Sequence, residues 1–271
     1  MNYRLSRIAA ICGGKFSGCD SEVRSVVTDS RSLSCELGCR PMFVAMRGAN
    51  HDSHDFIAGM QSRGVRAFLV ERGVEASSCT GECGFVQVDN AIEALQRLAA
   101  YHRAQFRGTV VGITGSNGKT VIKEWIAEEL PEGMKYYRSP KSYNSQLGVP
   151  LSVLMLEGDE ELAIFEAGIS KPGEMERLER IIRPDAVIFT SIGDAHQENF
   201  INLEQKCDEK MILARSASKI IYHSYYEPLG RMVAAHFADR RPVDAAAYPE
   251  VPESVIGNAA SRRNAQIVEA F

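Results

Sequence analysis

With 271 residues, of which 45% are hydrophobic and 24% charged, the chain has the length and composition of a globular protein with two domains, not of a disordered or fibrous one. Its 31 lysines and arginines nearly balance 35 aspartates and glutamates, and the net charge of −4 without a long basic run argues against nucleic acid or a membrane surface as partner. No segment approaches the roughly 18 consecutive apolar residues that a membrane-spanning helix needs.

The chain opens with a pattern that predicts an amphipathic helix within residues 1–14. The apolar patch at residues 8–12 is shorter than the apolar core of a signal peptide, so we expect a cytoplasmic protein. The first third of the chain contains six of the seven cysteines: Cys12, Cys19, Cys35, Cys39, Cys79 and Cys83. Because both close pairs have C-x-x-x-C rather than C-x-x-C spacing, free thiols are expected in preference to a zinc knuckle.

Short strand and helix patterns then alternate over the first hundred residues. Strands are predicted at residues 23–28, 42–46, 67–70 and 85–88, and a helix at residues 56–63. Apolar residues at helical spacing predict a further helix over residues 91–106, which leads into the rest of the chain. Residues 1–106 are therefore predicted to form a small α/β domain.

Residues 107–271 carry the pattern of a second α/β domain. Continuous apolar runs, typical of buried parallel strands, are found at residues 109–114, 162–165, 186–190 and 219–222. Helical segments separate them, so a parallel sheet with crossover helices is expected. Residues 243–255, rich in Ala, Pro and Glu, predict a loop, and residues 261–271 a helix.

The most informative motif is a glycine-rich loop at residues 112–120, G-I-T-G-S-N-G-K-T, between the first of these strands and a helical pattern over residues 122–130. Such a loop directs backbone N–H groups inward and can bind polyphosphate, with Lys119 reaching the outer phosphates and the Thr120 hydroxyl binding Mg²⁺. Ile113 replaces the first glycine of the strict Walker form, so the motif is a variant. An ordinary turn would leave the Lys-Thr pair unexplained, and a dinucleotide site lacks both G-x-G-x-x-G and a ribose-binding acid.

Polar side chains follow two other predicted strands. Glu166 comes directly after residues 162–165, and His196 follows residues 186–190. Taken alone, each fits a solvated strand-end charge or a loop histidine. Because the carboxyl ends of parallel strands meet at one edge of a sheet, we expect Lys119, Glu166 and His196 to converge there.

These motifs, in this order, resemble the Mur ligase family, the ATP-dependent enzymes that add amino acids to a peptidoglycan precursor, and among them the D-alanyl-D-alanine-adding branch. The resemblance extends from residue 5 to about residue 215. It is carried by T-D-S-R at residues 28–31, F-V-A-M-R-G at 43–48, D-S-H-D-F at 52–56, G-S-N-G-K-T at 115–120, S-Y-N-S-Q-L-G-V-P at 142–150, E-A-G at 166–168, G-E at 173–174 and G-D-A-H at 193–196.

The resemblance implies a role for each matching residue. Ser30 and Arg31 would hold the uridine diphosphate end of the substrate, and Asn144 would line the cleft. The ATP phosphates would lie on Gly115, Ser116, Asn117, Gly118, Lys119 and Thr120. Mg²⁺ ions would be bound by Thr120, Glu166, His196 and Lys210, the last as a carbamylated lysine whose spacing from His196 fits better than that of Lys206. The alternative for Lys210 is a solvated helix lysine.

The implied function is ATP-dependent amide-bond formation, in which D-alanyl-D-alanine is added to a UDP-N-acetylmuramoyl-tripeptide through an acyl phosphate. The sequence has Val121 where the family usually has a second hydroxyl residue. This variant, together with S-Y-N-S-Q at residues 142–146, is similar to the ligase part of proteins in which the ligase is fused to an alanine racemase. Nothing after residue 215 resembles the family's third domain, so the chain is expected to be a fragment with little activity alone. The alternatives are another Mur-type or folate-directed ligase and a non-catalytic nucleotide-binding module.

Overall fold

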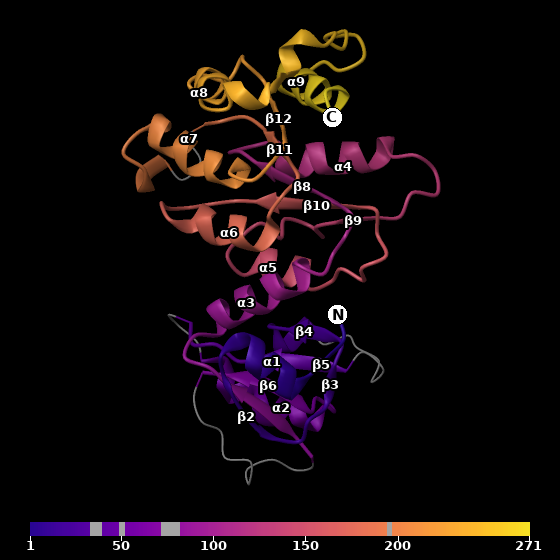
Figure 1. Cartoon of the computed structure of the whole chain (residues 1–271), viewed down its shortest axis with the longest axis vertical. Coiled ribbons are helices and arrows are strands. Elements are labelled where there is room, and N and C mark those ends of the chain that lie inside the picture. Colours follow the sequence, from indigo (N-terminus) through magenta and orange to yellow (C-terminus); the bar gives the residue numbers. More distant parts are fainter. Residues whose placement is uncertain (33–39, 49–51, 72–81, 194–196) are drawn as a thin grey trace. The chain divides into compact units, whose positions relative to one another are not determined.

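The computed structural model describes residues 1–32, 40–48, 52–71, 82–193 and 197–271. The chain divides into two compact units. Unit 1 comprises Met1–Gln105 with Leu154–Glu157, and unit 2 comprises Phe106–Val153 with Gly158–Phe271. Each unit has its own main β-sheet flanked by helices (Figure 1).

Unit 1 is built on a sheet whose spatial order is β2 (Lys15–Gly18), β7 (Gly84–Gln87), β6 (Ala67–Val70), β5 (Pro41–Val44) and β4 (Ser25–Val27). Strand β2 runs antiparallel to β7, and the other neighbours are parallel. A separate antiparallel pair consists of β1 (Tyr3–Arg4) and β3 (Glu22–Val23). The helical segments are α1 (Leu5–Cys12), η1 (Ser30–Ser32), η3 (Ser53–Phe56), α2 (Ile57–Ser62) and α3 (Ala91–Arg103).

Aromatic side chains from three neighbouring strands form the centre of unit 1. Phe43, Phe68 and Phe85 are almost completely buried. The rings of Phe68 and Phe85 stack with centroids 5.3 Å apart, and Phe43 meets Phe68 edge-on at 6.5 Å. Such pairs contribute beyond their buried area, so they fix the register of the parallel strands.

Unit 2 is built on a sheet of parallel strands in the order β13 (Val243–Asp244), β12 (Lys219–Tyr222), β11 (Ala186–Phe189), β8 (Thr109–Thr114), β10 (Leu162–Ala167) and β9 (Tyr136–Arg138). Strand β8 lies between β10 and β11, so the chain reverses its direction of travel across the sheet beside β8. In open parallel sheets the carboxyl ends at such a reversal are where ligands bind.

The helical segments of unit 2 are α4 (Lys119–Glu129), α5 (Gly148–Val153), α6 (Glu174–Ile182), η5 (Gln197–Asn199), α7 (Leu203–Met211), η6 (Ile212–Ala214), α8 (Leu229–His236), η7 (Ala238–Arg240), η8 (Ala245–Ala247) and α9 (Ala259–Glu269). Helix α9 begins at its cap residue Asn258, whose side chain accepts hydrogen bonds from the N–H groups of Ala260 and Ser261.

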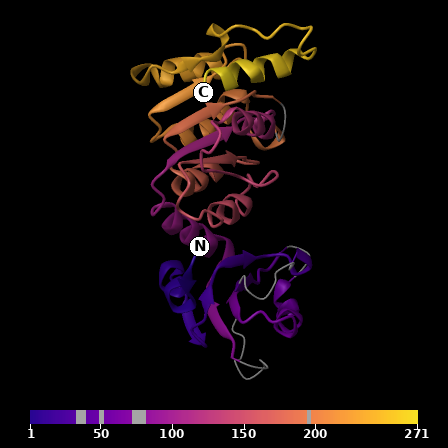
Figure 2. The ribbon, with the colours of Figure 1, turned by 90° about the vertical axis from the view of Figure 1, so that its right-hand side faces the viewer.

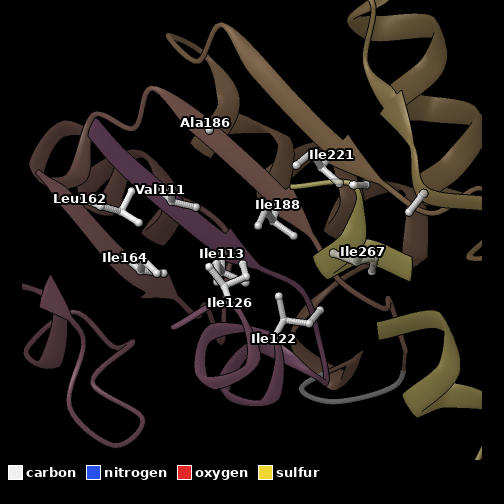
Figure 3. Packing of buried hydrophobic residues seen from close by; sticks show 12 residues of the cluster. Val111, Ile113, Ile122, Ile126, Leu162, Ile164, Ala186, Ile188, Ile221 and Ile267 are labelled. Atoms are coloured by element: carbon white, nitrogen blue, oxygen red, sulfur yellow. The ribbon is translucent and has the colours of Figure 1, made fainter. Parts of the chain in front are cut away.

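One face of the unit 2 sheet is covered by α4 and α9, which lie side by side in both views of the ribbon (Figures 1 and 2). Ile122 and Ile126 are one helical turn apart on α4 and pack with Ile267 of α9 onto the strands (Figure 3). The strand residues of this cluster include Val111, Ile113, Ile164, Ile188 and Ile221. The first turn of α4, which carries the phosphate-loop lysine, is thereby anchored to the core.

The structure corrects two expectations from the sequence. The segment 243–255 was expected to be a loop, but Val243 and Asp244 pair with Ile221 and Tyr222 as strand β13, and η8 follows. Two residues give no periodic signal, and only pairing with β12 makes them a strand. Strand β10 also extends through Glu166 to Ala167, so the carboxylate lies within the strand instead of beyond its end.

No helix in the described ranges combines the length and the apolar character required to cross a bilayer.

Candidate functional site

The glycine-rich loop connects β8 to α4, and its backbone requires glycine at two positions. Gly115 has φ +152° and Gly118 has φ +85°, which side chains of L-residues rarely allow. A Cβ atom on Gly115 would lie 1.8 Å from the Thr190 hydroxyl oxygen. The close approach of the loop to the residue after β11 is therefore possible only without a side chain.

Hydrogen bonds from the segment after β11 hold the loop in place. The Thr190 hydroxyl donates to the carbonyl of Asn117 at 2.6 Å, and the Ser116 N–H donates to the Ser191 carbonyl at 2.7 Å. The Ser116 hydroxyl oxygen also accepts from the Gly193 N–H at 3.0 Å. The loop is thus shaped before any ligand binds, by residues that the sequence analysis did not assign to the site.

Lys119 is the first residue of α4, and its ammonium group folds back over the loop. It donates to the carbonyls of Gly115 at 2.8 Å and Ser116 at 3.2 Å. Burial lowers the pKa of Lys119, and the charge of Glu166 opposes that shift. A cation in a glycine-rich loop at the N-terminus of a helix is an arrangement that binds anions.

Glu166 is completely buried, which excludes a solvated strand-end charge. Its Oε2 atom accepts from the Thr120 hydroxyl at 3.1 Å and from the Asn144 side-chain amide at 3.3 Å. Its Oε1 atom forms an ion pair with Lys123 at 2.9 Å. The structure therefore brings together three residues that the sequence predicts for the site, and it adds a fourth.

Lys123 is the residue that the sequence analysis missed. Its side chain is 0% exposed and its ammonium group also donates to the carbonyls of Ser139 and Lys141, both at 2.7 Å. It therefore links α4, strand β10 and the segment leading to Asn144. The available signal was its spacing, because Lys123 follows Lys119 by four residues and Thr120 by three, which puts all three on one side of a helix.

Two lysines of α7 lie beside the site: Lys210 contacts the glycine-rich loop and Lys206 contacts the segment after β11. Lys210 is 2% exposed and donates to the Gly115 carbonyl at 3.1 Å, while Lys206 donates to the Gly193 carbonyl at 2.6 Å. Burial, and then the charges of Lys119 and Lys206, lower the pKa of Lys210 to about 7. The solvated-lysine alternative for Lys210 is therefore wrong, while its carbamylation stays a prediction.

The remaining site residues from the sequence lie elsewhere or outside the description. His196 falls in residues 194–196, outside the described residues. Ser30 and Arg31 form part of η1 in unit 1, where the Arg31 guanidinium makes two hydrogen bonds with Asp29 at 2.9 and 3.0 Å. The Arg31 side chain is 89% exposed, so its guanidinium is accessible to a ligand.

The residues present fit a nucleotide phosphate and a hard divalent cation. The Thr114 hydroxyl, at the end of β8, is buried and has no hydrogen-bond partner among the described residues. Thr120 and Glu166 offer hydroxyl and carboxylate oxygens, the ligand types that Mg²⁺ prefers. Within the described ranges, no cluster of three or more His, Cys, Asp and Glu side chains could hold a metal by itself. A cation here would therefore share its coordination with phosphate oxygens, as is usual for Mg²⁺.

The thiols that are described do not form a metal site either. Cys12, Cys19 and Cys207 are free thiols, and Cys35, Cys39 and Cys79 lie outside the described residues.

Proteins of known family are similar to this chain in sequence and in structure. Residues 113–238 match the Mur ligase middle domain, so the match continues past residue 215, where the sequence motifs end. The chain is 31% identical over 189 residues to UDP-N-acetylmuramoyl-tripeptide--D-alanyl-D-alanine ligase of Bacillus subtilis (strain 168), covering 70% of this chain and 40% of the relative. It is 34% identical over 206 residues to the ligase of the same name from Borreliella burgdorferi, covering 72% and 44%.

Solved structures have the same fold. MurF from Acinetobacter baumannii superimposes with a TM-score of 0.77 at 24% identity, covering 90% of this chain and 53% of that protein. MurF ligase from Thermotoga maritima, solved in complex with ADP, gives a TM-score of 0.67 at 28% identity, covering 82% and 49%. The chain thus spans about half the length of these structures, and less than half of the two curated relatives.

Proposed function

The chain belongs to the Mur ligase family, and from this premise we propose that it supplies the acceptor-binding and ATP-binding parts of a D-alanyl-D-alanine-adding ligase of peptidoglycan synthesis. In the proposed reaction the terminal carboxylate of a UDP-N-acetylmuramoyl-tripeptide attacks the γ-phosphorus of ATP and ADP leaves. The amine of D-alanyl-D-alanine then displaces phosphate from the acyl phosphate, forming the amide and losing one proton. Unit 1 would hold the uridine-linked acceptor through Ser30 and Arg31.

In this proposal the glycine-rich loop and Lys119 bind the ATP phosphates. Thr120 and Glu166 would hold one Mg²⁺ and His196 a second, with carbamylated Lys210 as a further oxygen ligand. Bound Mg²⁺ supplies positive charge that offsets the repulsion between the carboxylate and the triphosphate. Lys123 orients Glu166 through the ion pair with Oε1, while Asn144 fixes the carboxylate atom next to Thr120.

The observation that supports the proposal most directly is the meeting of Thr120 and Glu166 at 3.1 Å, beside a loop shaped to take phosphate. The two residues are 46 positions apart, and they come from α4 and from β10, the strand next to β8. Family resemblance alone would not require them to be within hydrogen-bonding distance. Their contact is what a shared cation ligand set needs.

Nucleotide binding tests the proposal first. We expect ADP with Mg²⁺ to raise the thermal midpoint of the chain, and Lys119→Ala to abolish most of that rise. Lys171→Ala, at an exposed lysine outside the loop, is the matched control and should respond as the wild type does. Equal responses of wild type and Lys119→Ala would show that the loop is not the phosphate site.

Phosphate release tests the reaction itself. Because the chain spans about half of its relatives, we expect it to release phosphate slowly or not at all with the uridine-linked tripeptide and D-alanyl-D-alanine. Adding the remaining part of a relative, or using a longer chain, should restore release that depends on D-alanyl-D-alanine. If another amino acid restores phosphate release in place of D-alanyl-D-alanine, the protein is another Mur-type ligase. If the longer chain binds nucleotide but releases no phosphate, it is a non-catalytic module. A fused alanine racemase stays a prediction.

A further inference from the structure

Unit 1 contains a cavity of about 760 Å³ that the proposed reaction does not use. We call it the arginine cavity, because its lining includes Arg4, Arg40, Arg63 and Arg66. Pro41 and Ala67, the first residues of β5 and β6, also line it, so it lies where these parallel strands begin. Ser30 and Arg31 follow the opposite, carboxyl end of β4. The arginine cavity therefore lies at the other end of the strands from Ser30 and Arg31, and Arg63, which donates to the Ser30 carbonyl, is the lining residue that connects the two places.

The lining has a net positive charge, since four arginines face only two acidic residues, Asp20 and Glu22. Both acids are already engaged. Glu22 forms ion pairs with Arg24 and Arg40, and the Asp20 carboxylate accepts hydrogen bonds from the N–H and the hydroxyl of Ser6 at 2.8 Å each. The two carboxylates offset only part of the charge of the four arginines, so the lining keeps a net positive charge.

Arg4 and Arg66 are held in place by main-chain carbonyls. Arg4 donates through Nη1 to the Asp20 carbonyl at 2.9 Å. Arg66 donates through Nη1 to the carbonyls of Gln61 and Val65 at 2.8 and 3.0 Å. Among the described residues, the Nε and Nη2 donors of both guanidinium groups have no partner. That pair of donors makes the two parallel hydrogen bonds by which arginine binds phosphate or carboxylate.

Ser21 also lines the cavity, but its hydroxyl oxygen is buried and not accessible to a ligand. The described lining contains no aromatic side chain on which a nucleobase could stack.

We propose that the arginine cavity binds a small molecule that carries a phosphate or diphosphate group, held by the paired donors of Arg4 and Arg66. The volume suits a ligand of metabolite size. The anchored guanidinium groups lose little conformational freedom on binding, which favours affinity. The ligand would stabilise unit 1, independently of nucleotide on unit 2.

Titration calorimetry with pyrophosphate, without Mg²⁺ and at physiological ionic strength, tests the proposal. The titration is run on Lys119→Ala as well as wild type, because pyrophosphate could also bind the glycine-rich loop. We expect binding to persist in Lys119→Ala and to weaken by at least about tenfold when Arg4→Gln and Arg66→Gln are added. Arg63 is left intact because it donates to the Ser30 carbonyl, beside the predicted uridine diphosphate site.

Arg97→Gln is the matched control, since Arg97 also donates to a main-chain carbonyl but does not line the cavity. It should bind pyrophosphate as the wild type does. If circular dichroism shows that the double variant is unfolded, Arg66→Lys is used in its place. This variant keeps the positive charge but removes the paired donors, so it should still weaken pyrophosphate binding. The proposal is overturned if the wild type does not bind pyrophosphate. It is also overturned if Lys119→Ala abolishes binding while the arginine variants bind as the wild type does, or if Arg97→Gln weakens binding as much as the substitutions of Arg4 and Arg66.

Discussion

At the scale of single residues, the site depends on a few side chains whose environment is unusual. Lys123 and Glu166 are oppositely charged, are both 0% exposed and lie 2.9 Å apart. Removing one partner of such a pair leaves an uncompensated buried charge, which costs far more than the pair itself contributes. The pair therefore makes the position of Glu166 sensitive to a residue that would touch neither nucleotide nor metal.

We predict that Lys123→Met lowers the free energy of unfolding by about 3–5 kcal/mol, because Glu166 loses its counter-charge. Urea unfolding followed by circular dichroism measures this change. Lys171→Met, at an exposed lysine, should be close to wild type. The double variant Lys123→Met/Glu166→Leu should recover part of the loss, because neither charge is then buried alone. A double variant less stable than Lys123→Met would contradict the ion-pair explanation.

Gly115 is predicted to tolerate no side chain. Gly115→Ala would place Cβ 1.8 Å from the Thr190 hydroxyl oxygen, so the loop must move and ADP binding should be lost. Gly133→Ala is the matched control, because Gly133 also has a positive φ but its Cβ would meet nothing within 4 Å. That control should lose only about 1–2 kcal/mol of stability from backbone strain and bind ADP normally. Calorimetry and urea unfolding on both variants separate close contact from strain.

At the scale of elements, the phosphate loop is supported from two sides. The segment after β11 hydrogen-bonds to it, and α4, which begins at Lys119, is packed against the sheet together with α9. A Cβ on Gly118 would lie 3.1 Å from the Asn264 side-chain oxygen, so α9 also approaches the loop itself. Helix α9 is therefore part of what shapes the site, although it lies far from the loop in sequence.

Truncating a core side chain of α9 should consequently weaken unit 2. Ile267 is 0% exposed in the cluster that joins α9 to α4 and the strands (Figure 3). Ile267→Ala is expected to cost about 2–5 kcal/mol, because buried apolar packing is removed and a cavity is left behind. Val255→Ala, at a residue that is 72% exposed, should leave the midpoint of urea unfolding unchanged. If Ile267→Ala is as stable as the wild type, the packing of α9 does not contribute to the stability of this core.

At the scale of the whole molecule, each unit has its own core and carries a buried thiol that can report on it. Burial raises the pKa of Cys12 in unit 1 and of Cys207 in unit 2 to about 12. Near pH 8 both thiols are therefore almost entirely protonated, and the thiolate that reacts with alkylating reagents is scarce. Alkylation of either cysteine should thus require opening of its own unit.

We predict that ADP with Mg²⁺ protects Cys207 but not Cys12 during urea unfolding, because a ligand stabilises only the unit that binds it. Pulse alkylation near pH 8 with peptide mass spectrometry gives a separate curve for each cysteine. Lys119→Ala, which is expected not to bind ADP, supplies the control and should show no shift of either curve. Equal protection of both cysteines in the wild type would mean that the units unfold as one.

Much of the site could be predicted from the sequence because its signals are local. The glycine spacing, the Lys119-Thr120 pair and the apolar strand before them are contiguous, and the positive φ values of Gly115 and Gly118 are local features of the loop that favour glycine. The parallel arrangement followed from alternating strand and helix patterns, and it predicted that Glu166 would lie at the same edge of the sheet as Lys119. The position of Glu166 within the strand next to β8 came from the structure. The family resemblance rests on the same local motifs.

The tertiary structure alone decided the features that depend on long-range contacts. Lys123 is an ordinary helix lysine by sequence, and only the carbonyls of Ser139 and Lys141 together with Glu166 make it a buried cation. Strand β13 exists through its pairing with β12, and the arginine cavity gathers four arginines that are scattered between residues 4 and 66. The physical reason is the same in each case. Burial and charge pairing are properties of neighbours in space, whereas the chain by itself specifies only neighbours along its length.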